Sequence, residues 1–189
     1  YQAVSHIMNS AMTEAKVEVP VYETTRDIPE WKIAMRHLMI SHTSAGVRVV
    51  DMLAVDNPSD RTWIGTNEHE EGTTLILKLP PGAGNIEIGD GFTEHSLHFH
   101  NGTIYNVAPM TPGMTHYSFG YTIPVRSGKV EIPINTPALT QQLIVFAPND
   151  GSEIKANGLL EQGTRKTDGG EMRMFSGVAL MPGQPSGLT

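Results

Sequence analysis

The stretch IAMRHLMISHTSAGVRVVDMLAVDNPSDRTWIG, residues Ile33–Gly65, decides the fold class of this chain. It predicts two long β-strands joined by a polar turn, because apolar residues alternate at a period of two along the second strand. On one side of that strand lie Val47, Val49, Leu53 and Val55, interrupted by Asp51. Val50, Met52 and Ala54 on the other side are also apolar. We therefore expect both faces of this strand to be covered, as in the middle of a sandwich.

The second strand has a clear stop signal in its sequence. Asn57-Pro58-Ser59-Asp60 follows it directly. Proline removes a donor from the strand ladder, and Asn, Ser and Asp side chains satisfy a turning backbone locally. These residues predict a turn that ends the strand pair.

The rest of the chain reads as further short strands separated by turns. The strands are expected at Tyr1–Met8, Lys16–Tyr22, Thr73–Leu79, Gly84–Ile88, Thr93–His100, Thr103–Val107, Thr115–Ile123, Val130–Ile134, Leu143–Ala147, Glu153–Ala156 and Glu171–Leu180. Asn101-Gly102 is the strongest hairpin signal, and Asn9–Ala15 is the one place that suits a brief helix. Turns every eight to twelve residues predict an all-β protein, an antiparallel β-sandwich with little or no helix.

The alternation also predicts which side chains form the core. They are Val49, Leu53, Val55, Leu75, Leu77, Phe119, Tyr121, Ile144 and Val145. We expect these side chains to be largely buried between two layers of strands.

Composition excludes several classes of function. The chain has 189 residues, enough for a substantial core, and no cysteine, which excludes disulfides, thiolate metal sites and c-type haem attachment. Its net charge of −7 provides no basic footprint for nucleic acid or an anionic membrane surface. No apolar run is long enough for a membrane-spanning helix. Ten methionines and eight histidines are the one unusual feature of the composition.

Six segments of the chain carry a resemblance to a known family. They are VPVYETT, RHLMISH, VRVVDMLAVDNPSDRTWIG, TLILKLPPGAGNIEI, PGMTHYSFGYTIP and MFSGVALMPG. Together they resemble bacterial extracytoplasmic proteins with carboxypeptidase-regulatory-like, prealbumin-like β-sandwich domains. The resemblance implies a periplasmic or extracellular location and no active-site residue, because the matching segments are strand and turn signatures.

The resemblance also implies a domain organisation. Residues 1–28 would be the last strands of a preceding sandwich or an N-terminal extension, residues 29–182 the β-sandwich domain and residues 183–189 a linker. In the family such a linker often leads to a membrane helix. The implied partners are therefore other protein subunits or a neighbouring domain of the same chain, with membrane contact only through flanking segments.

A pair of histidines on one predicted strand is the best candidate for chemistry. His98 and His100 lie two residues apart, so both rings point to the same face, about 7 Å apart by the strand rise. Met110, Met114 and His116 follow, and a hairpin return would bring their loop near. Imidazole and thioether ligands together favour copper. The alternative, which we favour, is that the histidines face solvent and the methionines fill gaps in the core.

Other histidines give weaker signals. His37 and His42 flank a strand that contains Met39, and we interpret them as packed or surface histidines because no second ligand is spaced to match. His69 lies among Glu68, Glu70 and Glu71, an acidic loop that we interpret as solvated.

The sequence contains no recognisable catalytic motif. It lacks a Gly-x-Ser-x-Gly elbow, and its glycine-rich segments do not precede helices. The leading hypothesis is therefore a non-enzymatic extracytoplasmic β-sandwich, a structural or accessory subunit of an envelope or membrane-bound assembly. The alternative is a periplasmic copper-binding domain. A second alternative is a carbohydrate-binding accessory module, for which only Trp31 and Trp63 are available as large indole rings.

Overall fold

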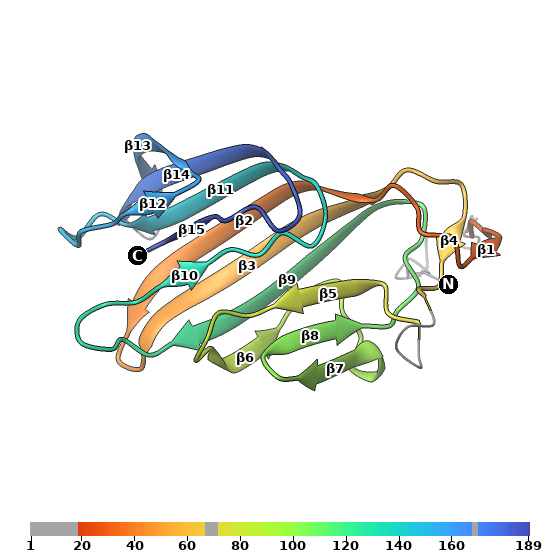
Figure 1. Cartoon of the computed structure of the whole chain (residues 1–189), viewed down its shortest axis with the longest axis horizontal. Helices are drawn as coiled ribbons and strands as arrows, with labels where there is room; N and C mark the ends of the chain where they lie inside the picture. The colour runs from red at the N-terminus through yellow and green to blue at the C-terminus, as the bar shows by residue number, and fades with distance from the viewer. Residues whose placement is uncertain (1–18, 67–71, 168–169) are drawn as a thin grey trace, which may run out of the picture.

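The protein is built from β-strands. The computed structural model describes residues 19–66, 72–167 and 170–189, and this part of the chain contains no α-helix. Its one helical element is a single 3₁₀ turn, Glu94–Ser96. The prediction of an all-β protein with little or no helix is confirmed (Figure 1).

One large twisted sheet of seven strands runs through the molecule (Figure 1). In spatial order its strands are β13 (Leu160–Thr167), β14 (Gly170–Leu180), β11 (Thr140–Pro148), β2 (Lys32–Thr43), β3 (Gly46–Asn57), β9 (Gly113–Ile123) and β6 (Gly84–Ile88). All neighbours pair antiparallel except β2 and β11, which are parallel. The predicted strand pair Ile33–Asn57 is the hairpin β2–β3 at its centre.

Two small sheets cover one face of the large sheet, which we call the inner face (Figure 1). The first consists of β5 (Leu75–Lys78), β8 (Thr103–Asn106) and β7 (Leu97–His100), and the second of β10 (Ile132–Pro133), β15 (Gly187–Leu188) and β12 (Ala156–Asn157). A short parallel pair, β1 (Thr24–Thr25) with β4 (Thr62–Trp63), lies at one end. Burial of the inner face against both small sheets forms a single hydrophobic core.

The predicted core is confirmed with one exception. Ile144 is only partly buried, whereas the other eight predicted side chains are buried. Ile144 lies on β11 between Leu143 and Val145, which are fully buried, so it points to the opposite face of the sheet. We call this opposite side the outer face.

Both turn predictions are confirmed at the atomic level. Asn101 and Gly102 have φ angles of 47° and 68°, the left-handed pair that a two-residue hairpin needs, and they connect β7 to β8. After β3, the Asn57 side chain accepts hydrogen bonds from Ser59 and donates one to the carbonyl of Met110, 3.0 Å away. Asn57 therefore ends the strand and ties it to a distant loop.

Several strand predictions need correction. Glu153–Ala156 is a strand only at Ala156, where β12 begins, and the eight-residue edge strand β13 (Leu160–Thr167) was not predicted. Val19–Tyr22 is exposed and not part of any strand, because Pro20 cannot donate to a ladder and no described strand lies beside it. Thr93–His100 is a strand only from Leu97, since Glu94–Ser96 forms the 3₁₀ turn and Ser96 is buried rather than outward-facing. The predictions for Tyr1–Met8 and Asn9–Ala15 fall outside the described residues.

The expected C-terminal linker also differs from the structure. Within residues 183–189, Gly187–Leu188 forms β15, which pairs with both β10 and β12. Leu188 is buried in the core, and Ser186 Oγ donates to the carbonyl of Ile134. This segment is the middle strand of a covering sheet, a role that its Gly- and Pro-rich sequence does not suggest.

Candidate functional site

The inner face contains a buried ion pair. Asp51, which interrupts the apolar row of β3, is fully buried and faces Arg36 of β2. Arg36 Nε donates to Asp51 Oδ1 at 3.0 Å, and Nη2 donates to Oδ2 at 2.6 Å. Arg36 Nη1 donates to the carbonyl oxygen of Asn135, at 2.6 Å, in the segment that covers the sheet. The pair therefore links two central strands to the covering layer.

The electrostatics of this pair indicate a structural role. Burial by itself lowers the pKa of Arg36, but the charge of Asp51 and their hydrogen bonds outweigh it, so the pKa is raised. Burial also raises the pKa of the Tyr121 hydroxyl, helped by the Asp51 carboxylate and opposed by Arg36. The raised pKa keeps the Arg36 guanidinium protonated in the core, which suits packing rather than proton transfer.

The outer face is apolar across its centre. Register pairs place one continuous row of side chains on four neighbouring strands, from β14 to β3. The row consists of Met174, Phe146, Met39 and Val50. All four are partly exposed, and in the described part of the chain no layer covers them. The expectation that both faces of the central strands are covered is therefore wrong for the residues that the structure describes.

A second row runs parallel to the first, two residues along each strand. It consists of Leu160, Ser176, Ile144, His37, Met52 and Ser118. At the edges of the face, Leu160 and Val178 are each 72% exposed. Six methionines lie on this face, namely Met35, Met39, Met52, Met114, Met172 and Met174. Flexible, polarisable methionine side chains are typical of adaptable binding surfaces.

One end of the outer face is hollowed. A cavity of about 670 Å³ has an apolar floor of Met39, Val50, Pro148 and Met172. Its rim carries the contact between His42 Nδ1 and Asp150 Oδ2, 2.9 Å apart. Hydrogen bonds from Ser152 lower the pKa of Asp150, with a smaller contribution from His42. An apolar floor within a polar rim is the arrangement that receives an anchoring side chain of a partner.

Charges at the borders of the outer face are paired with one another. Lys32 Nζ lies 3.4 Å from Asp56 Oδ2, both on this face. Arg48 hydrogen-bonds Glu87 across Gly120, whose missing side chain leaves room for the pair. The Arg48 hydrogen bond lowers the pKa of Glu87. These two pairs are satisfied internally, whereas Arg165 of β13, opposite Met172, adds an exposed charge at the border of the same face.

Unlike its apolar outer face, the edges of the large sheet are protected against pairing with a further strand. The edge strand β13 carries Glu161, Arg165 and Lys166 and has an irregularity between Glu161 and Thr164. At the other edge, β6 is short and its register shifts between Gly84 and Glu87. Charges and bulges at edge strands prevent a further strand from pairing there. A partner would therefore contact the face rather than extend the sheet.

The structure brings together no catalytic constellation in its described part. A second groove, of about 720 Å³, lies beside β10 and β15, and Lys78 and Glu131 are its only charged lining side chains. His42 has a carboxylate partner in Asp150, but no described hydroxyl hydrogen-bonds its other ring nitrogen. A nucleophile next to an oriented base is the arrangement that covalent catalysis requires.

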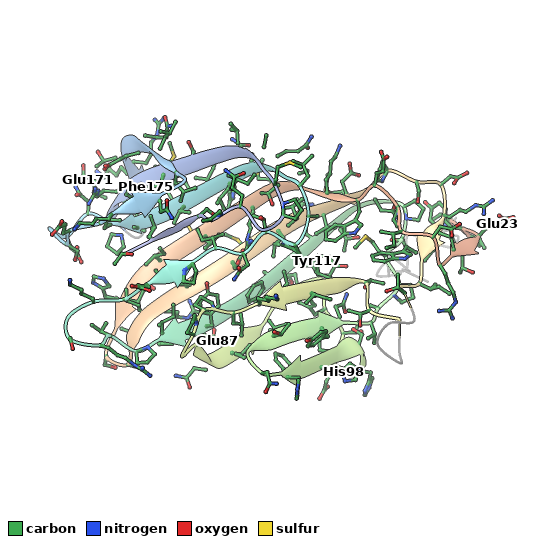
Figure 2. The ribbon with its side chains drawn as sticks, viewed as in Figure 1. Glu23, Glu87, His98, Tyr117, Glu171 and Phe175 are labelled. Carbon is green, nitrogen blue, oxygen red and sulfur yellow. The ribbon has the colours of Figure 1, made fainter. Side chains whose placement is uncertain are left out.

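His98 and His100 lie where the sequence predicts, side by side on β7 (Figure 2 labels His98). Their register partners on β8 are Tyr105 and Thr103, which alternate with the buried Ile104. Both histidines therefore point away from the core and are exposed. His100 Nε2 lies 2.9 Å from Asn101 Nδ2.

The other three residues of the predicted copper set are elsewhere. Met110 is 1% exposed, in the core beside Trp63. Met114 and His116 lie on β9 opposite Asp56 and Ala54, hence on the outer face. The large sheet separates them from His98 and His100, so the structure does not assemble the five residues into one site. No group of three or more His, Asp or Glu side chains in the described ranges is placed to hold a metal ion.

The tryptophans do not form an exposed platform for a sugar. Trp63 is 5% exposed, and Trp31 is half-buried against the core. The acidic loop around His69 lies outside the described residues.

No model of a protein family and no curated protein matches this chain. Among solved structures, the chain is similar to Legionella pneumophila aminopeptidase A, determined in complex with aspartic acid, with a TM-score of 0.48 and 11% sequence identity. The similarity covers 85% of this chain but 21% of that one, so the chain spans about a fifth of that protein's length. A likeness this distant carries no argument about fold or function. Within the described residues, the structure contains no helix long and apolar enough to cross a membrane.

Proposed function

We propose that this protein is a non-enzymatic β-sandwich of the prealbumin-like type that acts as a structural or accessory subunit, binding another protein subunit through its outer face. The observation that carries the proposal is the row of Met174, Phe146, Met39 and Val50, which lies uncovered across four strands. Contiguous exposed apolar surface of this kind marks protein interaction sites.

The chemistry of the face defines the kind of partner. Its central row is apolar, so the part of the partner surface that covers this row should also be apolar. The hollow floored by Pro148 and Met172 suits one large anchoring side chain of that partner. The location we propose is extracytoplasmic, as the resemblance to bacterial envelope proteins implies.

A photo-crosslinking amino acid tests the proposal in the cells that make the protein. We expect the crosslinker at Val178, on the outer face, to capture one defined protein of a different sequence. The same crosslinker at Val125, an exposed apolar residue on the loop after β9, is the matched control and should capture none. Phe146→Lys, which places a charge in the apolar row, should abolish the crosslink.

Three outcomes would overturn the proposal. They are equal crosslinking from Val178 and Val125, crosslinking of Val178 only to a second copy of this chain, and a compact free monomer by light scattering with no crosslink at all. The first would mean non-specific contact, and the second a homodimer instead of a subunit of a mixed assembly.

The copper-binding alternative at His98 and His100 keeps one supporting observation, the exposed side-by-side placement of the two rings. It loses its thioether ligands, because Met110 is buried and Met114 lies across the sheet. The carbohydrate alternative has no observation in its favour beyond the all-β architecture.

A further inference from the structure

The layer that covers the inner face consists of two separate sheets with adjacent edges (Figure 1). The strand β5 is the edge of one sheet and β10 is the edge of the other, and the two strands do not pair with each other. Both line the groove of about 720 Å³, β5 with Ile76 and Lys78 and β10 with Ile132 and Pro133. The groove therefore lies where two unpaired strand edges meet.

The hydrogen-bond register of β5 shows which of its backbone groups face the groove. Leu79 N donates to the carbonyl oxygen of Gly102 at 2.8 Å, and this bond continues the register between β5 and β8. Hydrogen-bonded and non-hydrogen-bonded positions alternate along an antiparallel strand. Leu77 therefore bonds to β8, whereas the backbone N–H and C=O groups of Ile76 and Lys78 point to the other side, into the groove.

These edge groups are poorly satisfied. In the described part of the chain the N–H and C=O groups of Ile76 have no hydrogen-bond partner. The Lys78 carbonyl oxygen accepts a hydrogen bond from Asn135 Nδ2 at 3.5 Å, which is longer than a usual N–H···O bond. The Asn135 amide thus takes the place that the N–H of a neighbouring strand would have. An unpaired row of backbone groups at a sheet edge is a template for another strand.

The opposite wall of the groove does not complete this edge. Ile134 N donates to the Ser186 carbonyl oxygen at 2.8 Å, which continues the register between β10 and β15. By the same alternation the backbone of Pro133 faces the groove, and proline has no N–H group to donate. β10 therefore offers no donor to β5 at Pro133, and the two sheets stay separate.

The side chains around the groove define the chemistry of a segment that could lie along β5. Ile76 is partly buried, and Pro133 and Pro185 add further apolar surface. Lys78 is exposed on the β5 wall, and Glu131 lies on the wall formed by β10. Opposite charges on neighbouring strands stabilise their pairing, so an acidic side chain is favoured beside Lys78.

We propose that this groove is a second interaction site, which binds an extended segment of a partner protein by strand addition to β5. The segment pairs with the backbone of Ile76 and Lys78, lays an apolar side chain against Ile76 and places an acidic side chain beside Lys78. Its own N–H group replaces the Asn135 amide at the Lys78 carbonyl. The groove and the outer face lie on opposite sides of the large sheet, so either interaction holds without the other.

Amide hydrogen exchange of the intact free chain tests whether the edge is open. The Leu77 N–H, which is paired with β8, should exchange slowly. We expect the Ile76 N–H to exchange at least about tenfold faster, because an unpaired edge amide reaches water without any opening of the sheet. Equal protection of Ile76 and Leu77 would mean that the edge is already covered in the free protein, and would overturn the proposal.

A displayed library of random heptapeptides is the probe for the segment, selected in parallel on the wild type and on Ile76→Pro. This variant removes the N–H that points into the groove but none that bonds to β8, and proline is tolerated on such an edge. We expect the wild type to enrich peptides with alternating β-branched residues and one acidic residue. The best of them should bind Ile76→Pro at least about tenfold more weakly, because a backbone hydrogen bond is lost and the proline ring obstructs the edge.

Ile76→Val keeps the N–H group and is the matched control, which should bind these peptides like the wild type. No enrichment by the wild type, or equal binding by Ile76→Pro, would overturn the proposal. Crosslinking from Val178 should persist in Ile76→Pro, so the two interaction sites can fail separately.

Lys78→Glu gives a second variant that leaves every backbone group in place, and it decides the matter if Ile76→Pro does not fold. On this variant we expect the library to enrich a basic residue where the wild type enriches an acidic one. The selected peptide should also slow the exchange of the Ile76 N–H in the wild type. A peptide that leaves this exchange rate unchanged, together with an unchanged charge preference in Lys78→Glu, would mean that peptides bind elsewhere and would overturn the proposal.

Discussion

The inner and outer faces of the strand β3 are both apolar, but they differ in what the fold does with them. On the inner face, Val49, Leu53 and Val55 are at most 2% exposed beneath the two small sheets. On the outer face, Val50, Met52 and Ala54 are only partly buried. The chain therefore uses one apolar face to fold. It leaves the other available, and that availability is the basis of the proposed binding function.

The two faces also treat charge differently. The inner face admits Arg36 and Asp51, but only as a fully hydrogen-bonded pair. The outer face places its ion pairs at the borders and has Met174, Phe146, Met39 and Val50 in a row across its centre. A core can satisfy a buried charge permanently, whereas a docking surface must be desolvated each time a partner binds.

The largest expected effect comes from breaking the inner ion pair. Asp51→Ala leaves the guanidinium of Arg36 buried and uncompensated, so the free energy of unfolding should fall by about 3–5 kcal/mol. Urea denaturation measures it. The double variant R36M/D51L should regain most of that loss, because replacing both partners by apolar groups is often close to neutral. A single variant as stable as the wild type would mean that the pair is not buried.

A neighbouring pair of residues on β3 compares the two faces directly. Leu53→Ala should cost about 2–5 kcal/mol through lost burial and the cavity that remains. Met52→Ala, one residue away on the outer face, should cost less than half as much because its side chain already contacts solvent. Equal losses in urea denaturation would contradict the assignment of inner and outer faces.

Local sequence patterns predicted the parts of this fold that depend on neighbouring residues. The alternation in Val47–Val55 predicted the central strand and its buried side, and Asn101-Gly102 predicted a hairpin with two positive φ angles. The burial of Phe119 and Tyr121 on β9 was predicted for the same reason, since they alternate along the strand.

Features that depend on pairing between distant segments were not predictable. The Gly- and Pro-rich end of the chain forms β15 only because Ile132 and Ala156 lie on either side of Leu188. The sequence does not show that His37 lies opposite Met52, a neighbour that the β2–β3 register provides. Asp51 likewise looks like an interruption until Arg36 is placed beside it. In each of these examples the neighbours are set by the register between paired strands. A single sequence does not reveal that register for strands that are not joined by a short hairpin.

The inner face also predicts a response to alkaline pH. Burial raises the pKa of Tyr121 well above its usual value near 10, so the hydroxyl stays protonated in the folded protein while it ionises in the unfolded chain. Stability should therefore be intact below about pH 10 and fall as the pH rises further. Tyr121→Phe removes this contribution and should shift the alkaline unfolding midpoint, followed by circular dichroism, to higher pH. An unchanged midpoint would mean that Tyr121 does not limit alkaline stability.

The smallest expected effect on stability lies at the exposed edge of the outer face. Val178 is 72% exposed, so Val178→Lys should change the free energy of unfolding by no more than about 0.5 kcal/mol, as for other surface substitutions. The same substitution at Val125, which is 49% exposed, is the control. The measurement is urea denaturation of the isolated full chain at two protein concentrations. A loss of about 2 kcal/mol or more at Val178 alone would mean that this part of the face is covered in the free protein. If that loss disappears on dilution, a second copy provides the cover; if it persists, the cover comes from the chain itself, and the outer face is not open to a separate subunit.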